Sequence, residues 1–195
     1  MLVDELMAES QNEIASVLSG DPHAFRRLVA KYQRLVSHVV FRFVRDPDDR
    51  ADLCQEVFIS VYQNLASFRG DCKLSTWIGR IAHNKCLNWL EKKRLPRYDD
   101  LGDDASIDQA PDQHAEPDQC VERRDLGRHV RTEIDRLPPL YGTILALYHL
   151  EDMSYREIGD IMNLPDGTVK SYLFRARRML KNRLAAAYRP EELWR

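Results

Sequence analysis

The sequence has no long apolar run, and this absence argues against an integral membrane protein. A membrane-spanning helix needs about 18 consecutive apolar residues, and no stretch of the 195 residues approaches that length. The acidic amino-terminal segment lacks a basic region followed by an apolar one, so we expect no secretory signal. Cys54, Cys72, Cys86 and Cys120 lack close-paired spacing, which predicts free thiols in a reducing, cytoplasmic compartment and no disulfide framework.

The sequence also has almost no net charge, which at first argues against a nucleic-acid partner. Its formal charge is −2 at pH 7, but this average hides a strong segregation. Basic side chains dominate from Arg69 to Arg97 and again from Asp166 to Arg189, whereas residues 98–122 carry acidic side chains and neither lysine nor arginine. Charge must therefore be considered segment by segment, and two segments are suited to binding a polyanion.

The acidic segment is typical of a linker. Residues 96–120 contain three prolines, one glycine and few large apolar side chains, so they cannot bury enough surface to offset the entropy of ordering the chain. We expect a flexible acidic linker between an amino-terminal domain at 1–95 and a carboxyl-terminal domain at 121–195. Fully extended, such a linker reaches at most about 80 Å.

Alternating apolar residues typical of strands are missing, and a helical period is present instead. The sequence predicts an all-α protein of two small helical domains, the second with a helix-turn-helix. We expect helices near residues 10–19, 25–43, 53–65, 75–94, 121–137, 139–150, 154–162 and 166–187.

The strongest local pattern lies at residues 154–180. Ser154 followed by Glu157 predicts a capping box at a helix start, and Asn163-Leu164-Pro165 ends that helix before another begins at Asp166. Two short helices joined by such a turn are typical of a helix-turn-helix.

The second helix of this pair separates into an apolar and a basic face. Val169, Leu173, Ala176 and Leu180 share one stripe that would pack inward. Ser171, Phe174, Arg175 and Arg178 lie on the opposite face. Arginines and short polar or aromatic side chains suit contacts with phosphates and base edges in the major groove. The alternative is an ordinary solvated basic face, but the capped helix and tight turn before it favour DNA contact.

The helix predicted at 75–94 carries a second candidate surface. Trp77, Arg80, Asn84 and Asn88 lie on one side of it, and Lys73 stands just upstream. An aromatic ring beside an arginine and two amides suits unpaired bases, and the preceding loop at 68–74 suits an extruded base. The alternative is that Trp77 belongs to the core, since tryptophan is usually largely buried, and the pattern alone favours this alternative.

The remaining groups of polar residues do not predict a metal site or a catalytic site. Cys72, His83 and Cys86 are a poor zinc pattern because a fourth ligand and paired spacing are missing. No nucleophile with a base, phosphate loop or pair of catalytic carboxylates stands out, so we expect no enzyme, no metal and no cofactor. Asp52, Gln55 and Glu56 form an exposed polar ridge that, taken alone, is a solvated face.

Two blocks of sequence nevertheless resemble a known family. Residues 52–58 (DLCQEVF), 67–70 (SFRG) and 76–84 (TWIGRIAHN) are similar to region 2 of the bacterial extracytoplasmic-function sigma factors. The run from Leu137 to Tyr148, residues 153–159 (MSYREIG) and residues 167–171 (GTVKS) resemble region 4 of the same factors. The blocks occur in the right order from about Gly20 to Leu184, without the domain that separates them in larger sigma factors.

The resemblance implies roles for the candidate residues. The surface that docks on the β′ clamp helices of RNA polymerase corresponds to Asp52, Gln55, Glu56 and Phe58. The element that opens the −10 promoter element and reads it as a single strand corresponds to Phe68, Arg69, Lys73, Ser75, Thr76, Trp77, Arg80, Asn84 and Asn88. The helix that reads the −35 element as duplex corresponds to Thr168, Lys170, Ser171, Tyr172, Phe174, Arg175 and Arg178.

The resemblance also implies partners. They are core RNA polymerase (β′ clamp helices and β flap), promoter DNA and an anti-sigma factor, with the acidic linker lying along basic channels of the polymerase. The alternatives are a stand-alone helix-turn-helix regulator, which binds duplex DNA by itself and usually as a dimer, and a protein-only adaptor.

Overall fold

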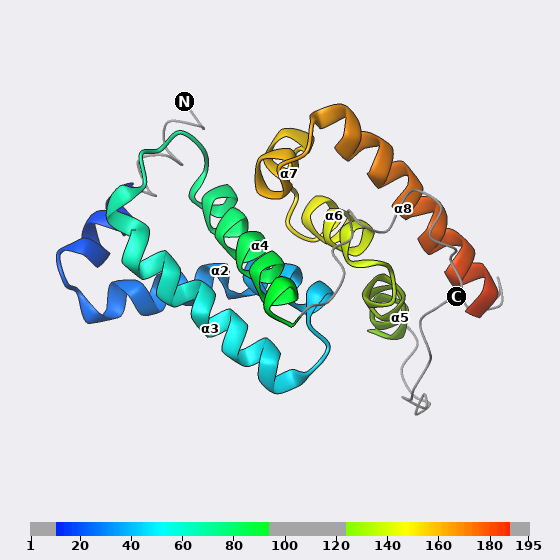
Figure 1. Cartoon of the computed structure of the whole chain (residues 1–195), viewed down its shortest axis with the longest axis horizontal. Coiled ribbons are helices and arrows are strands. Elements are labelled where there is room, and N and C mark those ends of the chain that lie inside the picture. Colours follow the sequence, from blue (N-terminus) through cyan, green and yellow to red (C-terminus); the bar gives the residue numbers. More distant parts are fainter. Residues whose placement is uncertain (1–10, 94–123, 188–195) are drawn as a thin grey trace.

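The computed structural model describes residues 11–93 and 124–187, and regular structure in these ranges is helical throughout (Figure 1). A short helix at 11–18 precedes the longer elements. These are α2 (Pro22–Phe43), α3 (Pro47–Asn64), the 3-10 turn η1 (Leu65–Ser67), α4 (Leu74–Lys92), α5 (Arg124–Asp135), α6 (Pro139–His149), α7 (Tyr155–Met162) and α8 (Asp166–Ala187). The predicted all-α class is confirmed. The predicted linker at 96–120 lies outside the described residues, and the domain boundaries stay a prediction.

Two of the helices begin by the same local device, an aspartate before a proline. Asp21 accepts a hydrogen bond from the backbone N–H of His23 at 2.8 Å, and Pro22 opens α2. Asp46 accepts from the backbone N–H groups of Asp48 and Asp49, both at 3.0 Å, and Pro47 opens α3. An aspartate N-cap followed by proline satisfies or removes donors that a helix start leaves unpaired. Asp46-Pro47 therefore starts α3 well before the helix expected at 53–65.

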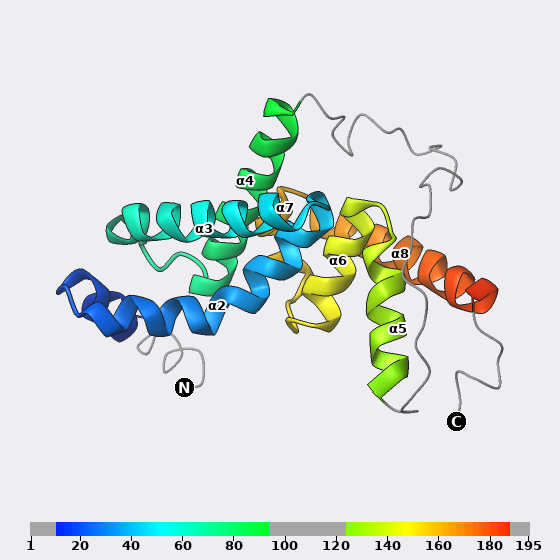
Figure 2. The same ribbon diagram turned by 90° about the horizontal axis from the view of Figure 1, so that it is seen from below.

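The amino-terminal half is built by α2, α3 and α4, which pack on one another (Figures 1 and 2). Val36, Val39 and Val40 of α2, Val57 and Val61 of α3, and Ile78 and Ala82 of α4 are fully buried. They recur at helical spacing, as the sequence pattern predicted.

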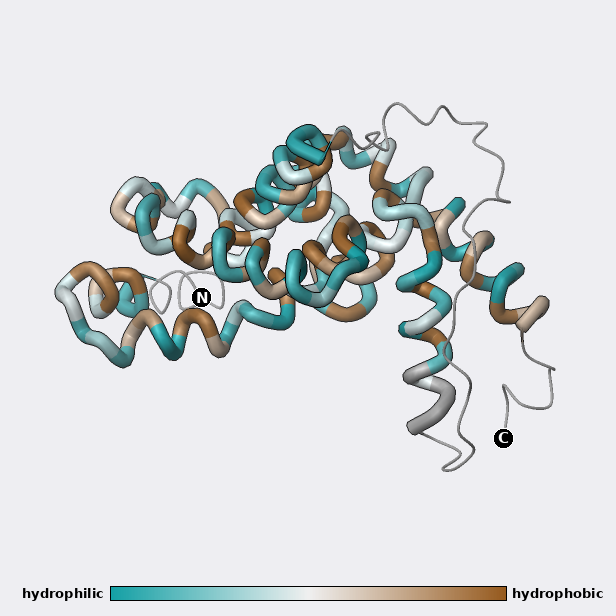
Figure 3. The backbone as a smooth tube through the Cα atoms, turned by 60° about the horizontal axis from the view of Figure 1, so that its bottom comes forward, coloured by the Kyte–Doolittle hydropathy of each residue, from teal (hydrophilic) through white to brown (hydrophobic). Residues whose placement is uncertain are grey.

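The carboxyl-terminal half consists of α5 to α8, with α6 packed against the other three helices. Its buried side chains include Ile144 and Leu147 of α6, Ile158 of α7 and Val169 of α8. Along the backbone of both halves, the hydrophobic stretches lie largely where helices face one another (Figure 3).

The two halves are in contact, and this arrangement was not expected from the sequence. α6 lies against α2, and α7 lies against α4. Figures 1 and 2 both show α7 beside α4. The buried apolar side chains of the two halves form one continuous cluster.

Candidate nucleic-acid interface

The basic face of α8 is open to solvent. Phe174 has 68% of its surface exposed, and Lys170, Ser171, Arg175 and Arg178 are exposed as well. Val169, Leu173 and Ala176 face the core and are almost fully buried. The predicted division of this helix into an inward apolar stripe and an outward basic face is therefore confirmed, although Leu180 at its end is only half-buried.

Two residues predicted to meet DNA are held partly inward. Tyr172 is half-buried, and its ring meets the ring of Tyr141 edge-on at 5.8 Å between centroids. Thr168 is also half-buried at the start of α8. The Arg175 guanidinium lies 6.0 Å from the centroid of the Tyr172 ring, so Tyr172 can position an arginine of the basic face through a cation–π contact.

Local contacts fix both the start of α7 and the turn that joins α7 to α8. Ser154 and Glu157 form the predicted capping box: the Ser154 backbone N–H donates to Glu157 at 2.8 Å, and the Glu157 N–H donates to Ser154 Oγ at 3.3 Å. Asn163 ends α7 in the left-handed conformation at φ 56°. A Cβ on Gly159 would lie 2.6 Å from the backbone oxygen of Leu164, so only glycine allows the turn to close this tightly on α7.

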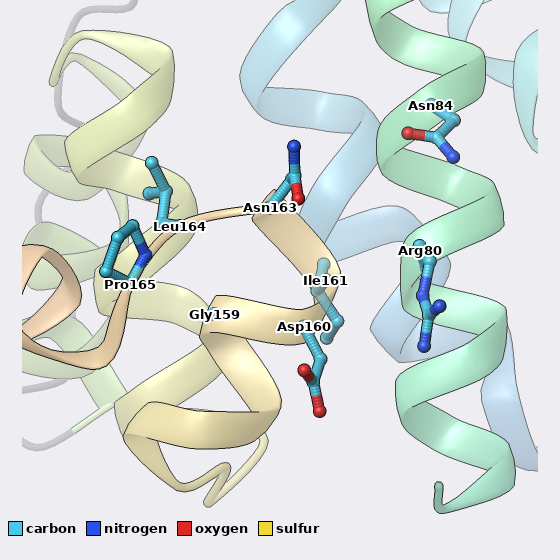
Figure 4. Close-up of a pocket in the computed structure, with 8 residues that line it drawn as sticks. All are labelled: Arg80, Asn84, Gly159, Asp160, Ile161, Asn163, Leu164 and Pro165. Carbon is cyan, nitrogen blue, oxygen red and sulfur yellow. The ribbon is translucent and has the colours of Figure 1, made fainter. Parts of the chain in front are cut away.

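The second candidate surface follows one side of α4. Arg80, Asn84 and Asn88 are exposed along it. The Lys73 Nζ atom lies 2.7 Å from Oε1 of Glu157, which stands on α7 of the other half. Arg80 and Asn84 line a cleft of about 640 Å³ together with residues 159–161 and 163–165. Figure 4 shows both side chains projecting from α4 toward the side on which Asp160 and Asn163 lie.

The loop and first turn of α4 contain both exposed and buried residues. Arg69 is exposed, and Phe68 and Ser75 are half-buried. Trp77 is half-buried and meets Phe68 edge-on at 5.5 Å between ring centroids, so it combines core packing with a partly accessible ring. Thr76 is fully buried, and its Oγ1 makes no hydrogen bond. Thr76 is therefore not available to DNA, and its predicted contact is wrong in this structure because the side chain belongs to the core.

The polar ridge on α3 is exposed as expected, and it continues into an apolar patch that the sequence prediction missed. Asp52, Gln55 and Glu56 are exposed, and Phe58 is half-buried against the core. Ile59 is 48% exposed and Tyr62 57% exposed. Since the spacing of 52, 55, 59 and 62 puts them on one helix face, the helical period was the signal that could have identified Ile59 and Tyr62.

Cys72, His83 and Cys86, which the structure describes, do not form a metal centre. In the part of the chain that the structure describes, no three histidine, cysteine, aspartate or glutamate side chains lie close enough to hold a metal ion. Burial raises the pKa of the Cys86 thiol and lowers the pKa of His83 to about 4, so both are neutral groups of the core near pH 7.

Known families match both halves. The model of sigma-70 region 2 matches residues 28–95, and that of sigma-70 region 4 matches residues 128–180. The chain is 36% identical to the "RNA polymerase sigma-H factor" of Pseudomonas aeruginosa, over 90% of this chain and 94% of that protein. It is also 36% identical to the "ECF RNA polymerase sigma-E factor" of Haemophilus influenzae, over 88% of this chain and 93% of that protein. The chain belongs to the extracytoplasmic-function sigma factors.

A further relative agrees with this assignment, and two solved structures share the fold. The sigma-E factor of Escherichia coli K12 is 35% identical over 94% of this chain and 95% of its own length. The structure of "CnrH in complex with the cytosolic domain of CnrY" covers 92% of this chain with a TM-score of 0.63 at 22% identity. The sigma factor RpoE of Bartonella quintana, solved with the anti-sigma factor NepR, covers 84% of this chain with a TM-score of 0.60 at 18% identity. These structures share the fold.

The family assigns this sigma factor to transcription initiation, with core RNA polymerase and promoter DNA as the partners of regions 2 and 4. The region 2 match covers most of α2 and all of α3 and α4, and the region 4 match covers most of α5, all of α6 and α7 and most of α8. Among the described residues, none of the helices is long and apolar enough to cross a membrane.

Proposed function

We propose that this sigma factor docks on the β′ clamp helices of core polymerase through α3, reads the single-stranded −10 element through α4 and reads the duplex −35 element through α8. The observation that carries this proposal is the open basic face of α8, where Phe174 is 68% exposed beside Arg175 and Arg178. Such a face offers phosphate contacts and base-edge contacts from one helix. The two promoter surfaces lie on different halves of the chain, as two separate promoter elements require.

The α3 surface combines features suited to a protein partner. The exposed carboxylates of Asp52 and Glu56 suit a basic helix, and Ile59 and Tyr62 add apolar area beside them. Interfaces commonly join aromatic and apolar anchors to a polar rim. We assign Ile59 and Tyr62 to the polymerase-binding surface together with the predicted Asp52, Gln55, Glu56 and Phe58.

DNA opening needs no nucleotide hydrolysis in this scheme. Bases that leave the duplex gain contacts on α4 that paired bases cannot make, so binding shifts the equilibrium toward the open strand. Asn84 and Asn88 supply amides for base edges, and Arg80 supplies a charged, stackable guanidinium. We infer that the chain acts as a cytoplasmic binding factor and catalyses no reaction. An anti-sigma factor, such as the one bound to the Bartonella relative, is the expected regulator.

Run-off transcription with purified core polymerase, followed by mapping of start sites, tests the proposal. Arg175→Ala and Arg178→Ala should each lower initiation at promoters with a −35 element by about ten-fold, the effect of about 1–3 kcal/mol per specific contact. The matched control is Arg177→Ala on the same helix, because the Arg177 side chain is held by α6: its guanidinium lies 5.1 Å from the centroid of the Tyr148 ring, and its Nε donates to Nε2 of His149 at 3.2 Å. Equal loss in all three variants, or tight binding of promoter duplex without core polymerase, contradicts the proposal.

A further inference from the structure

The Arg175 guanidinium stands over the half-buried ring of Tyr172 on α8. We propose that Tyr172 is a positioning residue for the −35 surface: its ring, braced by Tyr141 of α6, holds Arg175 in the orientation that meets DNA. Tyr172 itself then makes no base contact, although the family resemblance implied a DNA contact for it. This inference rests on the proposed function of α8 and explains how an arginine of that helix is presented to the duplex.

The position of Tyr172 on α8 directs its side chain away from the exposed basic face. Successive residues of an α-helix lie about 100° apart around its axis, so Tyr172 is about 160° from Phe174, which follows two positions later. Phe174 is 68% exposed, whereas Tyr172 is half-buried. A helix that turns Phe174 into a major groove therefore turns Tyr172 toward its own domain, and the two rings cannot both lie in one groove.

Arg175 lies between these two directions. It is about 60° from Tyr172 and about 100° from Phe174 around the helix axis, and residues three positions apart are neighbours on a helix surface. The Arg175 guanidinium lies 6.0 Å from the centroid of the Tyr172 ring, at the outer end of the range of a cation–π contact. Because the long Arg175 side chain starts at the edge of the basic face, the group it packs against decides where its charge lies.

Tyr172 is in turn fixed by the start of α6. Its ring meets that of Tyr141 edge-on, with 5.8 Å between the centroids and 76° between the planes, an arrangement that aromatic pairs prefer. Both rings pack against the core. Tyr141 lies in the first turn of α6, which Pro139 opens with a φ angle suited to a helix start, and α6 packs directly on α8. The two rings thus connect a rigid helix start to the Arg175 side chain.

Holding the arginine in place favours DNA binding. Arg175 is exposed, and an exposed arginine loses much of its rotamer freedom when it contacts a base, which weakens binding. A ring that already restricts the guanidinium reduces this loss. The N–H donors of a guanidinium lie in its plane, so a cation–π contact made by its face leaves them available to base edges and phosphates.

Substitutions distinguish this role of Tyr172 from two others. A tyrosine that contacts a phosphate does so through its hydroxyl group, which Tyr172→Phe removes. A tyrosine that only fills the core can be replaced by another apolar side chain, and Tyr172→Leu keeps apolar bulk without a ring. A positioning ring gives a third pattern, because phenylalanine retains the π face that attracts the guanidinium and leucine does not.

The test compares two affinities of reconstituted holoenzyme: for a promoter located by start-site mapping, and for the same DNA with a scrambled −35 sequence. The ratio of the two isolates the reading of the −35 element, because a partly unfolded variant lowers both affinities alike. Tyr172→Leu should lower the ratio by about two- to five-fold, the effect of an exposed cation–π contact. Tyr172→Phe should keep the wild-type ratio. Tyr141→Leu, which removes the brace, should lower the ratio by less than Tyr172→Leu.

A double-mutant cycle tests whether the effect passes through Arg175. In an Arg175→Ala background no guanidinium remains to be held, so Tyr172→Leu should cause no further loss in the ratio. The matched background is Arg178→Ala. Arg178 is exposed and follows Tyr172 by six positions, about 120° around the helix and about 9 Å along it. In that background Tyr172→Leu should keep its full effect.

The outcomes separate this inference from the proposed function. An unchanged ratio in Tyr172→Leu, while Arg175→Ala lowers the ratio, overturns the positioning role alone. Equal losses in Tyr172→Phe and Tyr172→Leu assign the effect to the hydroxyl group and also overturn it, as does a loss that adds in full to that of Arg175→Ala. If Arg175→Ala leaves the ratio at the wild-type value, the proposed −35 role of α8 fails, and the positioning role fails with it.

Discussion

At the scale of single residues, His83 is the side chain whose titration should most affect stability. It lies on α4 with 2% of its surface exposed, and its ring meets Phe43 edge-on at 5.8 Å between centroids. Burial lowers its pKa to about 4 from 6.5. As the pH falls below about 6.5 the unfolded chain takes up the proton first, so stability falls through the range from 6.5 to 4.

The expected loss from His83 is about 2 kcal/mol between pH 7.5 and pH 5.0. Urea denaturation at the two pH values measures it, and His83→Leu should make the pH dependence shallower by about that amount. Burial also lowers the pKa values of His38 and His149, so some dependence remains in the variant. An unchanged difference between the two pH values in His83→Leu would show that this histidine does not carry the effect.

The burial of individual side chains was predicted well where it depends only on the periodicity of a single helix. Val169, Leu173 and Ala176 are buried because positions four and seven residues apart share a helix face. Thr76 was predicted from the sigma-factor resemblance to contact DNA, yet it is fully buried. α4 is packed by α2, α3 and α7, and tertiary packing of this kind is not visible in a local sequence pattern.

At the scale of the elements, the capping box of α7 sets the stability of the helix that covers α4. Ser154→Ala removes the hydroxyl that accepts from the Glu157 N–H and should lower the free energy of unfolding by about 1 kcal/mol. Urea denaturation followed by circular dichroism measures this change. Ser154→Thr keeps the hydroxyl and should recover most of the loss. Equal destabilisation by both substitutions would mean that packing, and not capping, sets the effect.

Helix ends were predicted correctly where a capping side chain identifies them. They were missed where the same residues can either end one helix or begin the next. The helix predicted at 166–187 matches α8, and Ser154 caps α7 as expected. Asp46-Pro47 was interpreted only as the break after the preceding helix, yet it also begins α3. Proline ends one helix and opens the next equally well, so only the backbone geometry distinguishes the two.

At the scale of the whole molecule, the contact between the halves is the feature that the sequence pattern did not predict. Arg34 and His38 of α2 both contact Glu151, which lies more than a hundred positions away along the chain. A sequence pattern within α2 therefore could not predict this contact. The segregation of charge was visible in the sequence, and it correctly located the exposed basic face of α8. How the two halves meet required the structure.

The most direct test of the central claim is permanganate footprinting of a promoter identified by start-site mapping. With core polymerase and this sigma factor, thymines near −10 should become reactive, and Asn84→Ala should reduce that reactivity several-fold while leaving protection at −35 intact. Arg178→Ala should instead weaken protection at −35. Neither core polymerase alone nor the free chain should open the DNA. Wild-type holoenzyme that initiates at this promoter without reactive thymines near −10 would contradict the claim.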